Sequence, residues 1–184
     1  MKDHEALVQH LTPPEGVSLP PYPAQRDRWY RRSLWGIFAG LVLEALGHWG
    51  IAGATESGFI LTALAIVLAA WTFLVWLRQW RWIVRALAVT GVVAGIWWPI
   101  AGWAGLLAAG SVMAAKEHHC FHFLPARLIP WTSLAFGMWW IAASARGLGW
   151  GYLVLAILWG WMAFDRKKLP LFEVNTNLLT KNGN

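Results

Sequence analysis

Long apolar runs alternate with short charged segments along most of the chain. Residues 34–52 and 58–77 are each long enough to cross a bilayer, because a membrane helix needs about 20 apolar residues and about 17 still suffice. Two more apolar runs follow, at about 129–145 and 147–164. The pattern therefore predicts an all-α membrane protein.

The apolar stretch from residue 82 to residue 115 has to be divided. It carries a single charge, Arg85, and it is too long for one upright helix and short for two. Pro99 stands in its middle, and residues before a proline are pushed out of helical geometry. A tight turn at 97–102 gives two spans here, and the whole chain then forms a bundle of about six short transmembrane helices.

The basic residues test this division, because they gather in every second segment between the apolar runs. With six spans these segments share one side, and the positive-inside rule makes that side cytoplasmic, with both termini there. A division into five spans would put Lys116 and Arg127 on the opposite side, which fits the rule less well. The clustered basic residues are Arg26, Arg28, Arg31, Arg32, Arg78, Arg81, Arg85, Lys116, Arg127, Arg166, Lys167 and Lys168.

Composition agrees with a membrane setting and excludes some partners. Apolar residues make up 58% of the chain and charged residues 13%, against about 25% charged in soluble domains. The net charge of +6 points to lipid headgroups and not to nucleic acid, because the basic residues lie between apolar runs. We predict a Pro-rich cytoplasmic arm at 1–30, a six-helix membrane domain at 31–166 and a cytoplasmic tail at 167–184.

The 16 tryptophans divide into two groups. Most lie at the expected span ends, where the indole N–H can reach the headgroups, as in an aromatic belt. Five lie deeper and either pack within the bundle or against lipid, or stack on a pigment, quinone or haem. These are Trp71, Trp103, Trp139, Trp140 and Trp159.

Glu44 and His48 form a polar pair inside the first apolar run. Glu44 lies about ten residues into that run, near the expected middle of the bilayer, and His48 follows four residues later on the same helix face. A charged acid at that depth costs about 2.5–3.5 kcal/mol, so an acid there suggests a proton or cation relay or a cofactor ligand. A neutral, hydrogen-bonded structural pair is the alternative. His48 could also be the single axial ligand of a pigment or haem.

The loop after the fourth span holds a cluster of metal-ligand residue types. His118 and His122 are four residues apart, so on a helix they share a face, and with Cys120 they could bind zinc or copper. A polar turn at the membrane surface is the alternative interpretation. The lone Cys120 could sense redox state, or it could be a small buried hydrophobe.

The residues Lys116, Glu117, Cys120 and Phe121 form the motif Lys-Glu-x-x-Cys-Phe. This motif resembles the signature of a bacterial, notably cyanobacterial, integral-membrane family known as domain of unknown function 2301. The resemblance implies a small multi-pass protein of the bacterial inner or thylakoid membrane and no established activity. Within the motif, Glu117 could serve as an acid, a base or a salt-bridge partner.

The sequence contains no nucleotide-binding loop, no nucleophile triad and no closed metal cluster. We therefore expect a non-enzymatic accessory or assembly subunit of a larger membrane complex, for example a photosynthetic one, with other membrane subunits and the lipid bilayer as partners. One alternative is a small ion or proton transporter, or a cofactor- or metal-handling protein, that uses Glu44, His48 and the loop at 116–122. A membrane oxidoreductase based on Cys120 alone is a further alternative.

Overall fold

A computed structural model describes residues 24–74 and 78–169. Within these residues the chain is all-helical, with six helices and no strands. The helices are α2 (Ala24–His48), α3 (Ala54–Thr72), α4 (Arg78–Gly95), α5 (Pro99–Phe121), α6 (Leu124–Trp140) and α7 (Ala145–Lys168). Most of the predicted arm at 1–30 and of the predicted tail at 167–184 lies outside the described residues.

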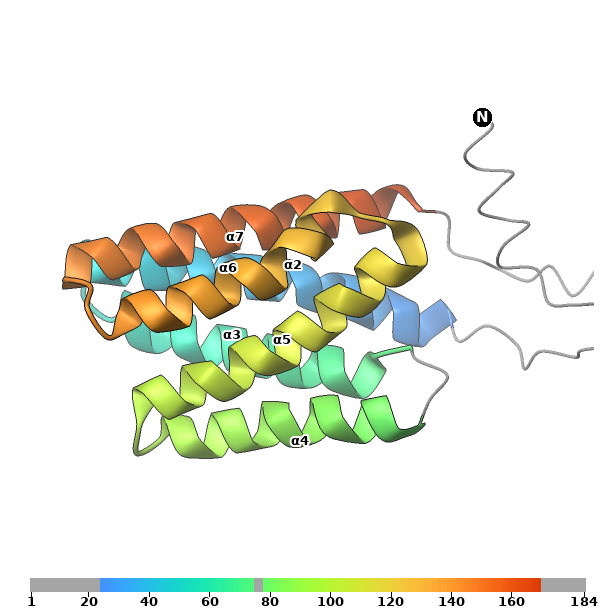
Figure 1. Ribbon diagram of the computed structural model, residues 1–184, viewed down its shortest axis with the longest axis horizontal. Coiled ribbons are helices and arrows are strands. Elements are labelled where there is room, and N and C mark those ends of the chain that lie inside the picture. Colours follow the sequence, from blue (N-terminus) through green and yellow to red (C-terminus); the bar gives the residue numbers. More distant parts are fainter. Residues whose placement is uncertain (1–23, 75–77, 170–184) are drawn as a thin grey trace, which may run out of the picture.

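The helices lie roughly side by side, and successive helices run in opposite directions (Figure 1). Helix α2 packs against α3 and α7. Helix α4 packs mainly against α5, and α6 contacts both α5 and α7. The beginnings of α2, α4 and α6 therefore share one end of the bundle with the ends of α3, α5 and α7. This shared end carries the basic segments noted in the sequence, and we call it the basic end. Arg146, at the start of α7, lies at the opposite end.

The predicted turn inside the apolar stretch 82–115 is confirmed. Helix α4 ends at Gly95, and α5 begins at Pro99. Pro99 thus lies in the first turn of α5, where the missing proline N–H removes no hydrogen bond. The loop that follows α5 is even shorter. His122 takes the left-handed conformation with φ of 56°, and α6 starts at Leu124.

The first helix differs from the expected span at 34–52. It begins at Ala24, because its polar first turns still bury an inner face formed by Asp27 and Tyr30. It ends at His48, before a turn in which Gly50 has a φ of 105°, a value that favours glycine. Glu44 therefore lies about one turn before the end of α2. Its expected depth near the middle of the bilayer stays a prediction.

Small residues bring neighbouring helices into close contact. A Cβ atom on Gly105 of α5 would lie 2.6 Å from the Cα atom of Gly91 on α4, and one on Gly58 would lie 2.6 Å from the backbone nitrogen of Glu44. In α5, Gly110 faces the ring of Trp159, so a Cβ there would lie 2.9 Å from it. These small residues thus serve packing within the chain, a use that the sequence did not distinguish from contacts with other subunits.

The five deeper tryptophans differ in burial. Trp103 and Trp159 are 3% and 2% exposed, so the packing interpretation is confirmed for these two. Trp103 meets the ring of Tyr152 with centroids 4.9 Å apart. Trp71 and Trp139 lie on the outside, 46% and 55% exposed, so they are not part of the core.

Two of the described helices, α3 and α7, are long and apolar enough to cross a bilayer by length and composition. Helix α6 has 17 residues, and α4 carries arginines in its first turns, which lowers its hydropathy. Large apolar side chains are nevertheless exposed on the outer faces of several helices. They include Ile60, Leu64 and Leu68 on α3, Trp82, Val89 and Val93 on α4, Trp131, Leu134 and Met138 on α6, and Val154, Ile157 and Phe164 on α7.

Candidate functional site: a buried charge cluster

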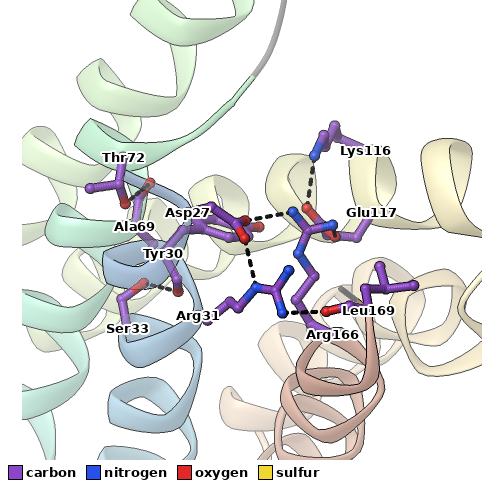
Figure 2. A network of polar contacts seen from close by, with 10 residues as sticks. All are labelled: Asp27, Tyr30, Arg31, Ser33, Ala69, Thr72, Lys116, Glu117, Arg166 and Leu169. Atoms are coloured by element: carbon purple, nitrogen blue, oxygen red, sulfur yellow. Dashed lines mark hydrogen bonds and ion pairs between the residues drawn. The ribbon is translucent and has the colours of Figure 1, made fainter. Parts of the chain in front are cut away.

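Asp27 is the centre of a buried ionic cluster at the basic end of the bundle (Figure 2). Its carboxylate accepts a hydrogen bond from Arg166 Nη2 at 2.7 Å and another from Arg31 Nε at 2.7 Å. The Asp27 side chain is fully buried, and the Arg166 side chain is 4% exposed. The contact joins the first turn of α2 to the last turn of α7, two segments that lie 139 positions apart in the sequence.

Glu117 brings helix α5 into the same cluster. Lys116 Nζ donates to Glu117 Oε1 at 2.9 Å, and Arg166 Nη1 lies 3.3 Å from Glu117 Oε2. The Glu117 side chain is fully buried, so its attraction to Lys116 and Arg166 is screened less by water than at the surface. Arg166 therefore stands between two acids, one from α2 and one from α5.

Aromatic rings lie against the cations of this cluster. The guanidinium carbon of Arg166 lies 4.3 Å from the centroid of the Phe121 ring, and Lys116 Nζ lies 5.2 Å from the same centroid. Cations attract the negative face of an aromatic ring, so Phe121 supports both cations without accepting a hydrogen bond. The buried hydroxyl of Tyr30 faces Glu117.

The charges of the cluster explain how an acid can stay ionised inside the protein. Burial alone would raise the pKa of Glu117, but Lys116 and Arg166 outweigh that effect and hold the pKa below its usual value. Glu117 lies beyond residue 115, outside the apolar span of its helix. The cluster contains three cations (Arg31, Lys116 and Arg166) and two acids (Asp27 and Glu117), so the acids are the limiting charges.

Three of the four motif residues lie in the buried ionic cluster. Lys116, Glu117 and Phe121 all take part in the cluster, and of the roles considered for Glu117 the geometry is that of a salt-bridge partner. Cys120 is half-buried and unpaired by a disulfide. Burial raises the pKa of its thiol, which disfavours the reactive thiolate needed for redox chemistry.

The loop histidines do not gather a metal-binding group. The ring centroids of His118 and His122 are 6.1 Å apart, and His118 Nδ1 lies 3.3 Å from the backbone oxygen of Phe123. Among residues 24–74 and 78–169, no three His, Cys, Asp or Glu side chains come together where they could hold a metal ion. The predicted set of His118, Cys120 and His122 is therefore not assembled in this structure.

Glu44 and His48 are neighbours at the other end of the bundle. His48 Nε2 lies 3.8 Å from Glu44 Oε2, and the His48 ring stacks on Tyr152 with centroids 5.3 Å apart. Glu44 is 3% exposed, so the acid is buried as the sequence suggested. One face of the His48 ring is covered by Tyr152 and its Nε2 is turned toward Glu44, and both the structural pair and the axial ligand stay predictions.

Asp27, Tyr30 and Arg166 belong to the cluster but were not singled out by sequence reasoning. Asp27 and Arg166 lie within basic segments, Arg-Asp-Arg and Asp-Arg-Lys-Lys, that were interpreted as contacts with lipid headgroups. A signal was present, since Asp27 is the only acid within the basic segment that precedes the first span. An isolated acid among arginines at a span end is a candidate ion-pair partner for a basic residue at another span end.

Comparison of the chain with protein-family models, with curated proteins and with solved structures gives no match. The resemblance carried by Lys116, Glu117, Cys120 and Phe121 therefore stays a prediction.

Proposed function

We propose that this chain is a non-enzymatic, multi-pass membrane protein that serves as an accessory or assembly subunit of a larger membrane complex. The observation that carries this proposal is helix α4. It buries only Val84, Ala88 and Gly91 in the bundle, while Val89 and Val93 are 42% and 46% exposed. A helix at the edge of a bundle with an apolar outer face suits contact with a transmembrane helix of another subunit.

The ion pairs of the interior support a role in which partners bind at the outer surface of the bundle. The buried acids Asp27 and Glu117 are engaged by arginine and lysine at distances of 2.7–3.3 Å. Groups held in such contacts fix helix packing and are not available to bind a substrate. The chain would then present a rigid scaffold, with its partners on the outside.

Six spans, with both termini on the cytoplasmic side, form the topological part of the proposal. Apolar side chains are exposed on the outer faces of α3, α4, α6 and α7, as expected for surfaces that contact lipid. The basic end gathers the arginines and lysines, which the positive-inside rule assigns to the cytoplasm. A bacterial inner membrane or a thylakoid membrane is the proposed location.

Labelling of Cys120, the single thiol of the chain, tests this topology. A membrane-impermeant maleimide should leave Cys120 unlabelled in intact cells and label it in inside-out vesicles. A matched control places Ser57→Cys in a Cys120→Ser background, because Ser57 is exposed at the opposite end of the bundle. That variant should be labelled in intact cells, and labelling of Cys120 there would contradict the six-span proposal.

Site-specific photo-crosslinking tests the accessory role. A photoreactive amino acid at Val93 on α4 should give a discrete protein adduct in native membranes. The same amino acid at Leu134, which is 58% exposed on α6, is the matched control site. Adducts with lipid alone at both positions would contradict the subunit proposal.

An absorption spectrum and metal analysis of the protein, purified in a mild detergent, would reveal a bound pigment, haem, zinc or copper.

A small proton or ion transporter is the second candidate function, and Glu44 favours it. Glu44 is buried, and His48 Nε2 lies 3.8 Å from its carboxylate. The nearby hydroxyl of Tyr152 has no hydrogen-bond partner among the described residues. Intramembrane acids commonly mark ion or proton pathways. Glu44→Gln keeps the size of the side chain, so loss of function with normal accumulation of that variant would favour this candidate over the accessory role.

A further inference from the structure

A small cavity lies at the centre of the bundle, where α2, α3, α5, α6 and α7 meet. Its volume is about 10 Å³. Much of its wall is apolar and includes Ile37, Leu106 and Trp159. Two wall residues carry hydroxyl groups, Thr62 from α3 and Ser133 from α6.

Both hydroxyl groups are buried and lack a hydrogen-bond partner among the described residues. Thr62 is 1% exposed and Ser133 is 6% exposed. A buried hydroxyl on a helix can bond to a carbonyl of its own helix, as Thr72 does with the oxygen of Leu68 at 2.7 Å. Thr62 and Ser133 do not use this solution, and both residues line the cavity.

The size and chemistry of the cavity select its occupant. A space of about 10–15 Å³ for the centre of a water-sized probe holds one water molecule, and a buried water needs two to four polar partners. A divalent cation such as calcium takes about six to eight oxygen ligands, which two hydroxyl groups do not supply. A larger organic ligand exceeds the volume.

We propose that a single water molecule occupies this cavity and bridges the hydroxyl groups of Thr62 and Ser133. The water can donate to one hydroxyl oxygen and accept from the other, so all three groups gain partners. The bridge connects α3 to α6 through the middle of the bundle. The bound water would then contribute to the packing of α3 against α6.

Replacement of Thr62 by valine tests the proposal through the sign of its effect, because valine has the same shape and lacks the hydroxyl. With water bound, Thr62→Val removes one of its partners, and the melting temperature in detergent should fall by about 2–4 °C. Without water, the variant only removes an unpaired buried hydroxyl, and the melting temperature should rise. A rise would therefore overturn the proposal.

Thr72→Val is the matched control on the same helix. The Thr72 hydroxyl bonds within α3 at a position that is 9% exposed, so its removal should change the melting temperature less than Thr62→Val does. The double variant Thr62→Val with Ser133→Ala should lose less than the sum of the two single variants, because each single change already weakens the same water. Additive losses would contradict a shared water.

Water-edited solid-state NMR of the unmodified protein in lipid vesicles gives a test that needs no variant. Magnetisation from water should reach the side chains of Thr62 and Ser133 early, while Leu155 and Ala156, which are fully buried and do not line the cavity, should respond late. Equally late transfer to all four residues would overturn the proposal.

Discussion

The two ends of helix α2 hold buried acids in different ways. At the basic end, Asp27 contacts two arginines, each at 2.7 Å. At the other end, Glu44 faces His48 at 3.8 Å, which is longer than a hydrogen bond. Both acids are nearly inaccessible, so burial alone does not tell them apart. The difference lies in the partners. At the basic end one of the two arginines, Arg166, comes from a distant helix, whereas the partner of Glu44 comes from α2 itself.

This difference assigns separate physical roles to the two ends. A buried cluster of ion pairs stabilises one arrangement of α2, α5 and α7, and the removal of one member leaves opposite charges uncompensated. A loosely paired acid contributes little to packing and keeps the freedom to exchange a proton. Substitutions that remove a single charge, without a change of size, can measure how far the two ends differ.

Asp27→Asn should have the largest effect on stability. It leaves Arg166, which is 4% exposed, with a weaker partner and leaves the cluster with three cations and one acid. We expect a loss of about 3–5 kcal/mol, the usual cost of breaking a buried ion pair. The measurement is thermal or denaturant unfolding of the purified protein in detergent, together with its yield in membranes.

Asp165→Asn is the matched control for that change. Asp165 pairs with Lys168, whose side chain is 60% exposed, and such surface pairs contribute about 0.5 kcal/mol or less. Equal losses at Asp27 and Asp165 would show that the cluster does not hold the helices together.

The same substitution at the two glutamates makes the comparison direct. Glu117→Gln weakens contacts with Lys116 at 2.9 Å and Arg166 at 3.3 Å, so a loss of about 2–3 kcal/mol is expected. Glu44→Gln should cost less than about 1 kcal/mol, because it alters one contact of 3.8 Å. Unfolding of both variants under one set of conditions gives the ratio, and a larger loss at Glu44 would reverse the assignment of roles.

The sequence predicted the helices better than it predicted the cluster. The apolar runs gave the number of helices in the described part of the chain, and Pro99 marked the turn between α4 and α5. The start of the first helix at Ala24 was missed, because hydropathy reports the apolar run and not the helix that continues into polar residues. Such a continuation depends on tertiary partners, here those of Asp27 and Tyr30.

The motif directed attention to Lys116, Glu117 and Phe121, which do enter the candidate site. Their partners, Asp27 and Arg166, could not be derived from spacing, because helical periodicity relates residues a few positions apart and not segments 139 positions apart. The pattern of basic segments places Arg166 at the basic end, but it does not separate an arginine in the headgroups from one in a buried pair.

Phe121→Leu should have a smaller effect than either acid substitution at the basic end. It removes the ring that lies 4.3 Å from the Arg166 guanidinium and 5.2 Å from Lys116 Nζ. A buried cation–π contact contributes about 2 kcal/mol and an exposed one about 0.5–1 kcal/mol. The control is Phe164→Leu, since Phe164 is 52% exposed and lies 4.4 Å from Lys168 Nζ. Equal losses in the two unfolding curves would show that the ring of Phe121 acts by its bulk alone.

Glu117 should also contribute to the pH dependence of stability. Its pKa in the folded protein lies below the usual value, held there by Lys116 and Arg166 against the effect of burial, while Tyr30 also faces it. An acid with a lowered folded pKa stabilises the protein above its unfolded pKa, which is about 4.3. That contribution is lost as the pH falls from this value through the folded pKa. The melting temperatures of the unmodified protein and Glu117→Gln should therefore differ most near pH 7 and converge below about pH 4. Other carboxyl groups titrate in both proteins, so the difference between the two curves isolates Glu117. A difference that stays constant over this range would mean that Glu117 is not held in its charged form by the cluster.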